Sequence, residues 1–270
     1  WSSDVCSSDL GAAQAIGQPR LSAPAGDAHK YTRGLLGVVG GAMPGAATLA
    51  ATAAQGAGAG YVKLYGSVPV CTPPDLVCDS QPLAEALLDK RIVALLVGPG
   101  LGRDGAAREA LAVVLSEQRP TVIDADALLL LAPRLLAEHF APLIATPHEG
   151  ELSSLERAFA LDGLGSKTER ALVLARTARM VVVAKGPDTV VAAPDGRIAF
   201  APRGSSWLST AGTGDVLAGA IASRLACGAE AFDAACQGVW LHGEAARLCG
   251  PAFAAGQLAE AVRAAYAACL

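Results

Sequence analysis

The chain has 270 residues, of which 52% are hydrophobic and 17% are charged, and its formal net charge is −4. This length suits one α/β domain or two small ones, and the mild acidity without a basic cluster argues against a nucleic-acid-binding surface. The cysteines number seven, and no two have C-x-x-C spacing, which disfavours a zinc site and a secreted disulfide framework. We therefore expect buried thiols in a reducing compartment, the cytoplasm.

The first 26 residues are predicted to be a disordered tail. The chain starts at Trp1, and residues 2–5 (SSDV) and 7–10 (SSDL) nearly repeat one another. Without an early positive charge or an apolar core, this start is not a signal peptide. It is either a non-native artefact of sequence assembly or a natural tail. Residues 27–270 are assigned to a single domain.

An uncharged stretch between residues 34 and 62 raises the question of a membrane helix. Such a helix needs roughly 20 predominantly apolar residues. Gly40-Gly41, Pro44 and Gln55 interrupt this stretch. We interpret it as a buried strand, a tight turn and an alanine-rich helix, and we expect no membrane segment.

Strands and helices alternate along the predicted domain. In chain order we predict strands at 35–39, 61–65, 92–97, 121–123, 143–145 and 180–184, a hairpin of 190–193 with 198–201, helices at 44–57, 83–88, 104–118, 167–178, 216–226, 231–248 and 257–269, and a loop at 71–82. The strand at 92–97 is continuously apolar, as expected for a central parallel strand. This alternation predicts a three-layer α/β/α fold with a mostly parallel central sheet.

The run STAGTGDVLAG at residues 209–219 is the strongest functional signal. Gly212 and Gly214 let backbone N–H groups approach an anion, and the helix that follows adds its positive end. A carboxylate at Asp215, beside such a phosphate site, can take a proton from a hydroxyl that attacks a phosphoryl group. The alternative is an N-capped helix in which Asp215 only complements the helix dipole.

Other glycine and polar motifs also follow predicted strands, at the edge where open α/β sheets bind ligands. GPGLG at 98–102 leaves its backbone accessible, although a turn with positive φ would explain it equally, and it is not a dinucleotide fingerprint. Asp124 and Asp126 could hold Mg²⁺ through water or orient a hydroxyl; alternatively, Asp126 caps a helix and Asp124 makes a hydrogen bond at the strand end. Lys185 lies at the end of a predicted strand, where its ammonium group could act as a point charge that binds phosphate.

His148 precedes a predicted helix with Glu149 and Glu151 in its first turn. The helix dipole explains the two glutamates. A neutral imidazole at His148 could hydrogen-bond a substrate amide or phosphate, while the alternative is a structural histidine. His139 and His242 are interpreted as structural, and His29 and Lys30 as charge near the pocket.

Taken together and in order, these motifs resemble the ADP-dependent NAD(P)H-hydrate dehydratases, a branch of the ribokinase-like superfamily. The matching segments are HKYTRG at 29–34, VVGG at 38–41, GPGLG at 98–102, DADAL at 124–128, TPHEGE at 146–151, KGPDT at 185–189 and the glycine turn at 209–219. Glu149 departs from the family, which commonly has proline there, and this adds a charge near the pocket.

The resemblance implies a role for each matching residue. Asp215 would be catalytic together with Gly212 and Gly214. The nucleotide would contact Lys185, Gly186, Pro187, Asp188, Thr189 and Gly214. The substrate would contact Ala46, Gly100, Gly102, His148 and Asp215. No metal ligand from the protein is expected, since Mg²⁺ would bridge nucleotide oxygens.

The implied reaction is dehydration of the S-form of hydrated NADH or NADPH (NADHX or NADPHX) back to NAD(P)H, with ADP giving AMP and phosphate. Eukaryotic relatives use ATP. The resemblance also implies a homo-oligomer, a tetramer, and a functional pairing with an NAD(P)H-hydrate epimerase. Two alternatives stay open: a kinase of the same superfamily acting on hydroxyethylthiazole or a vitamin-type alcohol, and a non-catalytic nucleotide-binding module.

Overall fold

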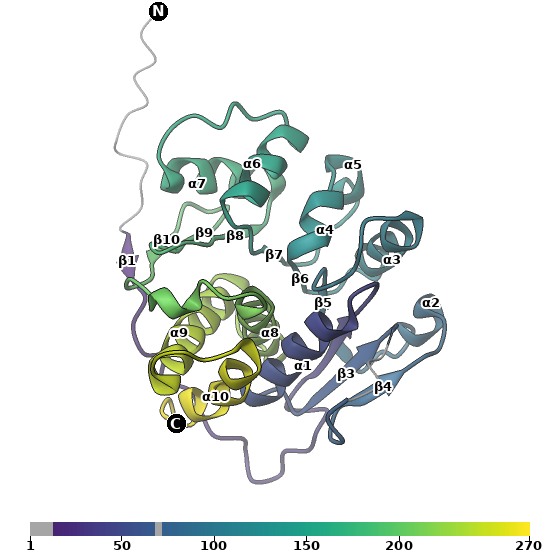
Figure 1. Cartoon of the computed structure of the whole chain (residues 1–270). Helices are drawn as coiled ribbons and strands as arrows, with labels where there is room; N and C mark the ends of the chain where they lie inside the picture. Colours follow the sequence, from purple (N-terminus) through teal and green to yellow (C-terminus); the bar gives the residue numbers. More distant parts are fainter. Residues whose placement is uncertain (1–12, 68–71) are drawn as a thin grey trace, which may run out of the picture.

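One sheet of ten strands runs through the middle of the protein, within residues 13–67 and 72–270, which the computed structural model describes (Figure 1). The strands are β1 Gln14–Ala15, β2 Leu35–Val39, β3 Tyr61–Tyr65, β4 Val77–Asp79, β5 Ile92–Val97, β6 Thr121–Ile123, β7 Leu143–Ala145, β8 Val181–Ala184, β9 Val190–Ala192 and β10 Ile198–Phe200. Their order across the sheet is β1-β10-β9-β8-β7-β6-β5-β2-β3-β4. β9 is antiparallel to β8 and β10, whereas the other neighbours are parallel, which confirms the predicted mostly parallel sheet.

Helices cover both faces of this sheet (Figure 1). They are α1 Pro44–Gly56, α2 Leu83–Ala86, α3 Gly105–Ser116, α4 Ala125–Leu130, α5 Pro133–Leu136, α6 Glu149–Ala158, α7 Lys167–Ala178, α8 Thr213–Ala226, α9 Ala231–Cys249 and α10 Ala255–Ala267, with a 3₁₀ turn, η1, at Ser206–Leu208. One layer holds α1, α8, α9 and α10, and the other holds α2 to α7 (Figure 1). The predicted three-layer α/β/α fold is therefore confirmed.

Side chains of the central strands alternate between the two layers. Leu35 and Val39 of β2 join the core under α3 to α7, whereas Leu36 and Val38 join the core under α1, α8 and α9. All four are at most 1% exposed. A strand covered on both faces must be apolar throughout, which explains why β2 and β5 appear as continuous hydrophobic runs in the sequence.

The helices α1 and α8 are in backbone contact. A Cβ atom added at Gly219 of α8 would collide with the carbonyl group of Ala50 in α1. The facing residues are small, which lets the two helix axes come this close. The middle of α8 is thereby fixed against the middle of α1.

The chain before residue 27 is where the sequence prediction was wrong. Gln14 and Ala15 pair in parallel with Ala199 and Phe200 of β10, and Ile16 is buried among apolar side chains of the α1, α8 and α9 layer. The domain therefore begins at least 13 residues before residue 27. The repeat at residues 2–10 lies outside the described residues.

A second correction concerns the predicted loop at 71–82, because Val77–Asp79 forms β4 beside β3. An ion pair of 2.6 Å between Lys63 and Asp79 joins these two strands. Three prolines in this segment led to the loop prediction, but all of them lie outside the short strand. Within the described ranges, none of the helices combines the length and apolar character needed to cross a membrane.

Candidate active site

The site is organised around the first turn of α8. Gly212 immediately precedes α8 with φ of 91°, and a Cβ atom there would lie 2.9 Å from both Leu49 and Ala255. Glycine is therefore required by conformation and by space. In the described part of the chain, the backbone N–H groups of Gly214 and Asp215 have no hydrogen-bond partner. These free donors and the helix dipole favour an anion at this position.

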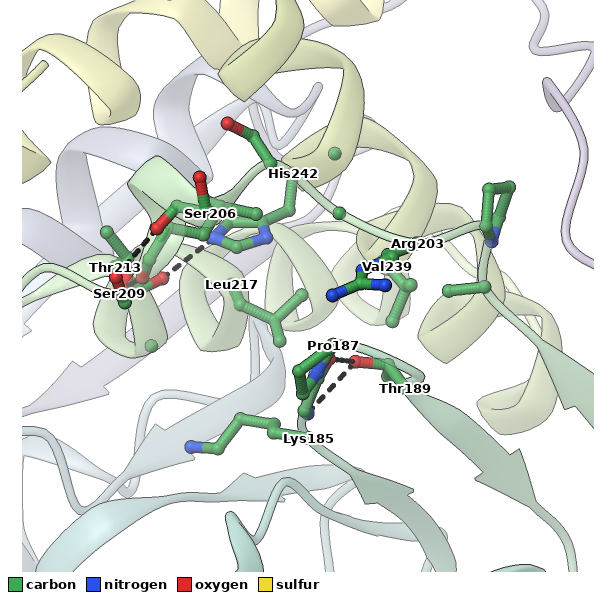
Figure 2. A pocket seen from close by; sticks show the side chains of 18 residues that line it. Lys185, Pro187, Thr189, Arg203, Ser206, Ser209, Thr213, Leu217, Val239 and His242 are labelled. Carbon is green, nitrogen blue, oxygen red and sulfur yellow. Dashed lines mark hydrogen bonds between the residues drawn. The ribbon is translucent and has the colours of Figure 1, made fainter. Parts of the chain in front are cut away.

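A cavity of about 620 Å³ opens beside this turn (Figure 2). Its wall is formed by the segment after β8, by the 201–209 segment, and by α8 and α9. The lining residues are Lys185, Gly186, Pro187, Thr189, Ala201, Pro202, Arg203, Gly204, Ser205, Ser206, Leu208, Ser209, Thr213, Gly214, Leu217, Val239, His242 and Gly243. The size suits a nucleotide, since ligand pockets typically measure about 300–1,000 Å³.

A buried charge cluster lies next to the cavity. Lys185 Nζ donates to Asp124 Oδ1 over 2.8 Å and lies 3.7 Å from Glu151 Oε2. Thr146 Oγ1 donates to the same Asp124 oxygen over 2.6 Å. Burial disfavours the ammonium charge, but the carboxylates of Asp124, Glu151 and Asp215 outweigh it and raise the pKa of Lys185. The lysine is therefore a fixed positive charge close to Gly214.

Asp215 has the properties of a general base. Burial raises its pKa to about 7, aided by the negative charge of Asp124 and opposed by the positive charge of Lys185. A carboxylate whose pKa lies near neutrality combines basicity with availability at working pH.

On the other side of the cluster, two loops meet at the carboxyl ends of β2 and β5. These strands are neighbours, and the chain continues from them in opposite directions across the sheet, so the loops lie at a topological switch point. Met43 N–H donates to Gly100 O over 2.8 Å, and the φ of Gly100 is 63°. A Cβ atom at Gly100 would collide with the Met43 carbonyl. Ala46 is half-buried in the first turn of the adjacent α1.

The comparisons with known proteins now identify the family. A family model for NAD(P)H-hydrate dehydratase matches residues 36–266. The chain belongs to this family. It is 40% identical over 241 residues to the ADP-dependent (S)-NAD(P)H-hydrate dehydratase of Neisseria meningitidis serogroup B, which covers 84% of this chain and 80% of that protein.

Two further members of the dehydratase family place the chain in context. It is 37% identical over 226 residues to the bifunctional NAD(P)H-hydrate repair enzyme Nnr of Mycobacterium leprae, covering 81% of this chain but only 46% of that protein. The structure also matches the ADP/ATP-dependent NAD(P)H-hydrate dehydratase of Bacillus subtilis, crystallised with ATP and Mg²⁺. The TM-score is 0.79 at 29% identity, over 93% of this chain and 95% of that one.

In this member of the dehydratase family, His148 has a structural role, which is the alternative that the sequence left open. Its Nδ1 accepts hydrogen bonds from the N–H groups of Gly150 and Glu151 over 3.0 and 3.3 Å, so His148 caps α6. Glu151 returns a capping-box bond to the His148 N–H over 2.8 Å. The imidazole is 62% exposed, and its Nε2 lies 3.5 Å from Glu151 Oε1.

Asp126 does not cap a helix, which was one of the roles that the sequence allowed. It accepts hydrogen bonds from Gly102 N–H over 3.0 Å and from Arg103 Nε over 2.7 Å. It therefore anchors the 98–102 loop rather than capping a helix. Gly102 has φ of 87°, which favours glycine there.

Several other predicted positions lie apart from the cavity. Asp188 does not line it: its side chain is 75% exposed and pairs with Lys167. Glu149 pairs with Arg170 over 2.6 Å. The Lys30 ammonium lies over the rings of Tyr31 and Tyr61. Tyr61 is the first residue of β3, so this contact lies at the edge of the sheet opposite the site. The expectation that His29 and Lys30 add charge near the pocket was therefore wrong.

Sequence reasoning missed three residues of the site, namely Glu151, Arg203 and His242. His242 Nε2 donates to Thr213 O over 2.9 Å while the ring lines the cavity, and burial lowers its pKa to about 4, so it is neutral. Arg203 projects into the cavity in Figure 2. His139 is structural as expected, with Nδ1 2.8 Å from Leu115 O.

Proposed function

We propose that this chain dehydrates the S-form of NADHX and NADPHX to NADH and NADPH, with ADP as the phosphoryl donor and AMP and phosphate as products. The observation that carries the proposal is the position of Asp215. It lies in the first turn of α8, next to Gly214 of the nucleotide-sized cavity, and is close enough to Asp124, Glu151 and Asp126 for their charges to raise its pKa. The names of the Neisseria and Bacillus relatives support this substrate and this donor.

The chemistry divides into two steps. First, Asp215 takes the proton of the hydroxyl at C6 of the hydrated ring, while that oxygen attacks the terminal phosphorus of ADP and the bond to AMP breaks. Next, the lone pair of the ring nitrogen expels phosphate from C6, and loss of the C5 proton restores the dihydropyridine. Phosphate leaves far more readily than hydroxide, which explains why a nucleotide is consumed.

The surrounding residues stabilise the charge that moves during the first step. The free N–H groups of Gly214 and Asp215 would face the transferring phosphoryl group, and Lys185 would supply a positive charge. The described residues hold no group of three metal-binding side chains. Mg²⁺ is usually held by substrate phosphates with only one or two carboxylates, so such a group is not required. Mg²⁺ would neutralise the phosphate oxygens.

The kinase alternative is disfavoured by the relatives, which are named dehydratases. The two activities also differ in their products, because a kinase accumulates a phosphorylated alcohol and the dehydratase does not. As part of the same proposal, we expect the enzyme to prefer ADP over ATP as the phosphoryl donor.

We further propose that the enzyme is a cytoplasmic homotetramer that works beside an epimerase activity. Exposed apolar side chains support self-association, since Phe140 is 79% exposed and Leu88 is 70% exposed. The bifunctional name of the Mycobacterium leprae relative supports the epimerase pairing. Light scattering after size-exclusion chromatography tests the tetramer directly.

The decisive experiment mixes the protein with hydrated NADH, Mg²⁺ and either ADP or ATP, and follows the recovery of NADH absorbance. We expect recovery with ADP, loss of recovery in Asp215→Asn, and normal recovery in Asp233→Asn, a matched change at an exposed position of α9. No recovery with either nucleotide in folded protein would refute the proposal and favour the kinase.

A further inference from the structure

A second cavity, of about 520 Å³, lies at the end of the molecule opposite the active site. It lies beneath the segment that joins β1 to β2, against the C-terminal ends of α1 and α8. Asp215 and Arg224 stand at the two ends of α8, about 14 Å apart at 1.5 Å of rise per residue. The two cavities have no lining residue in common.

Arginine side chains dominate the charge of this second cavity. Arg20, Arg33 and Arg224 line it, and Asp27 is the one acidic residue among its lining side chains. Across residues 13–67 and 72–270, none of the three arginines forms an ion pair with a carboxylate. Positive charge therefore exceeds negative charge by two around one cavity.

Arg224 is the most constrained of the three, being only 8% exposed. Its Nε donates to Gln237 Oε1 over 2.9 Å and its Nη1 to Ala57 O over 3.1 Å, and its guanidinium lies over the ring of Tyr266. All of these partners are neutral. Burying a guanidinium without a counter-charge costs desolvation free energy, and an anion bound beside it would offset much of that cost.

Helix capping explains only part of this arrangement. Arg33 Nη2 donates to Gly58 O over 3.3 Å, and Arg224 to Ala57 O, so both arginines satisfy carbonyls at the end of α1. A guanidinium carries five N–H donors. Arg33 uses one and Arg224 two for bonds within the described residues, and Arg20 uses none. Most donors around the cavity are therefore free for a ligand.

We propose that this cavity is a second ligand site, specific for a small organic phosphate monoester such as a sugar phosphate or a mononucleotide. A phosphate monoester carries between about 1.5 and 2 negative charges at neutral pH, which matches the excess of positive charge. Arginine forks bind phosphate oxygens in pairs. The cavity is much larger than a phosphate group, and Tyr266, Leu21 and Pro24 provide an apolar wall for a sugar or a base.

Isothermal titration calorimetry with ribose 5-phosphate tests the proposal on the full chain. We expect saturable binding, at least tenfold weaker in the double variant Arg20→Ala/Arg33→Ala, whose two side chains are exposed and so do not endanger folding. Arg108→Ala, on the exposed side of α3, is the matched control and should bind as the wild type does. Lys185→Ala, which alters the first cavity, should also leave this binding unchanged.

Three outcomes would overturn the proposal. One is the absence of saturable binding by the wild-type protein. Another is binding that is lost in Lys185→Ala but retained in Arg20→Ala/Arg33→Ala, which would place the ligand in the first cavity. The third is equal affinity for inorganic phosphate and ribose 5-phosphate, which would reduce the site to one for a simple anion. Comparison of AMP with ribose 5-phosphate then shows whether a base adds affinity.

Discussion

The charged residues around Asp215 have opposite effects on its pKa. Asp124, Glu151 and Asp126 raise its pKa together with burial, whereas Lys185 lowers it, and the result is about 7. A general base is useful only when it is deprotonated before the reaction begins. The resting protein therefore divides between an active and an inactive protonation state at neutral pH.

This division predicts the pH dependence of the reaction. Because kcat/KM reports the ionisation of the free enzyme, we expect it to fall about tenfold per pH unit below pH 7. Initial rates of NADH recovery between pH 5.5 and 8 measure this, with Asp233→Asn expected to follow the wild type. A flat profile over that range would contradict the assignment of Asp215 as the base.

The same raised pKa predicts a conflict between activity and stability at this residue. Above about pH 4 the unfolded chain loses the Asp215 proton that the folded chain keeps, so the unfolding free energy falls as pH rises towards 7. The Asp215→Asn variant has no carboxyl group at this position, so its unfolding free energy does not fall in this way. We expect the inactive variant to have a higher Tm than the wild type at pH 8, with a smaller difference at pH 5. Thermal unfolding at both pH values decides the matter.

At the scale of elements, the first prediction concerns the capping residue of α6, which is also a proposed substrate contact. His148 caps the helix through Nδ1, while Nε2 of the exposed ring lies 3.5 Å from Glu151 Oε1. His148→Asn should retain the cap and the Tm, whereas His148→Ala should cost about 1 kcal/mol of unfolding free energy. If Nε2 contacts the substrate, both variants raise the KM for NADHX. An unchanged KM in both would limit His148 to the cap.

The contact between α1 and α8 gives a second prediction at this scale. Gly219→Ala forces a methyl group onto the Ala50 carbonyl, so we expect the helices to separate, with a loss of at least about 2 kcal/mol. Gly256→Ala in α10 meets no atom within 4 Å and should be neutral or stabilising. Urea unfolding of the two variants compares them. Equal stability would mean that the contact has no energetic weight.

The local motifs of the site were predictable, while their partners were not. Gly212 and Asp215 belong to one continuous run whose geometry follows from a glycine turn and a helix. Glu151 was interpreted through its own helix, because its link to Lys185 depends on β7 and β8 being neighbours, which brings the start of α6 to the end of β8. Asp126 likewise meets Gly102 only through the order of strands β5 and β6. Such links come from the topology and leave no local pattern.

At the scale of the whole molecule, the segment before β2 proved to be part of the domain. Central strands such as 92–97 were predictable from their continuous apolar composition. β1 has only two residues, both exposed, and so has no periodicity to detect. Its place is set by pairing with β10 and by the burial of a single apolar side chain, Ile16.

Ile16 therefore gives the prediction for this scale. Ile16→Ala should lower the unfolding free energy by about 2 kcal/mol, since Ile16 is only 5% exposed. Leu270→Ala, at a 60% exposed position, is the control and should change little. Thermal unfolding of the two variants suffices. A wild-type Tm for Ile16→Ala would mean that the segment adds nothing to the stability of the domain.

The close contact of α1 with α8 also constrains how this enzyme can be re-engineered. A helix whose backbone touches its neighbour cannot be shifted to accommodate a longer or shorter phosphate chain. The 201–209 segment has no such restriction, because it lines the cavity from outside the helical layer and contains small and polar side chains. Libraries that aim to change the phosphoryl donor should therefore vary this segment and leave both helices as they are.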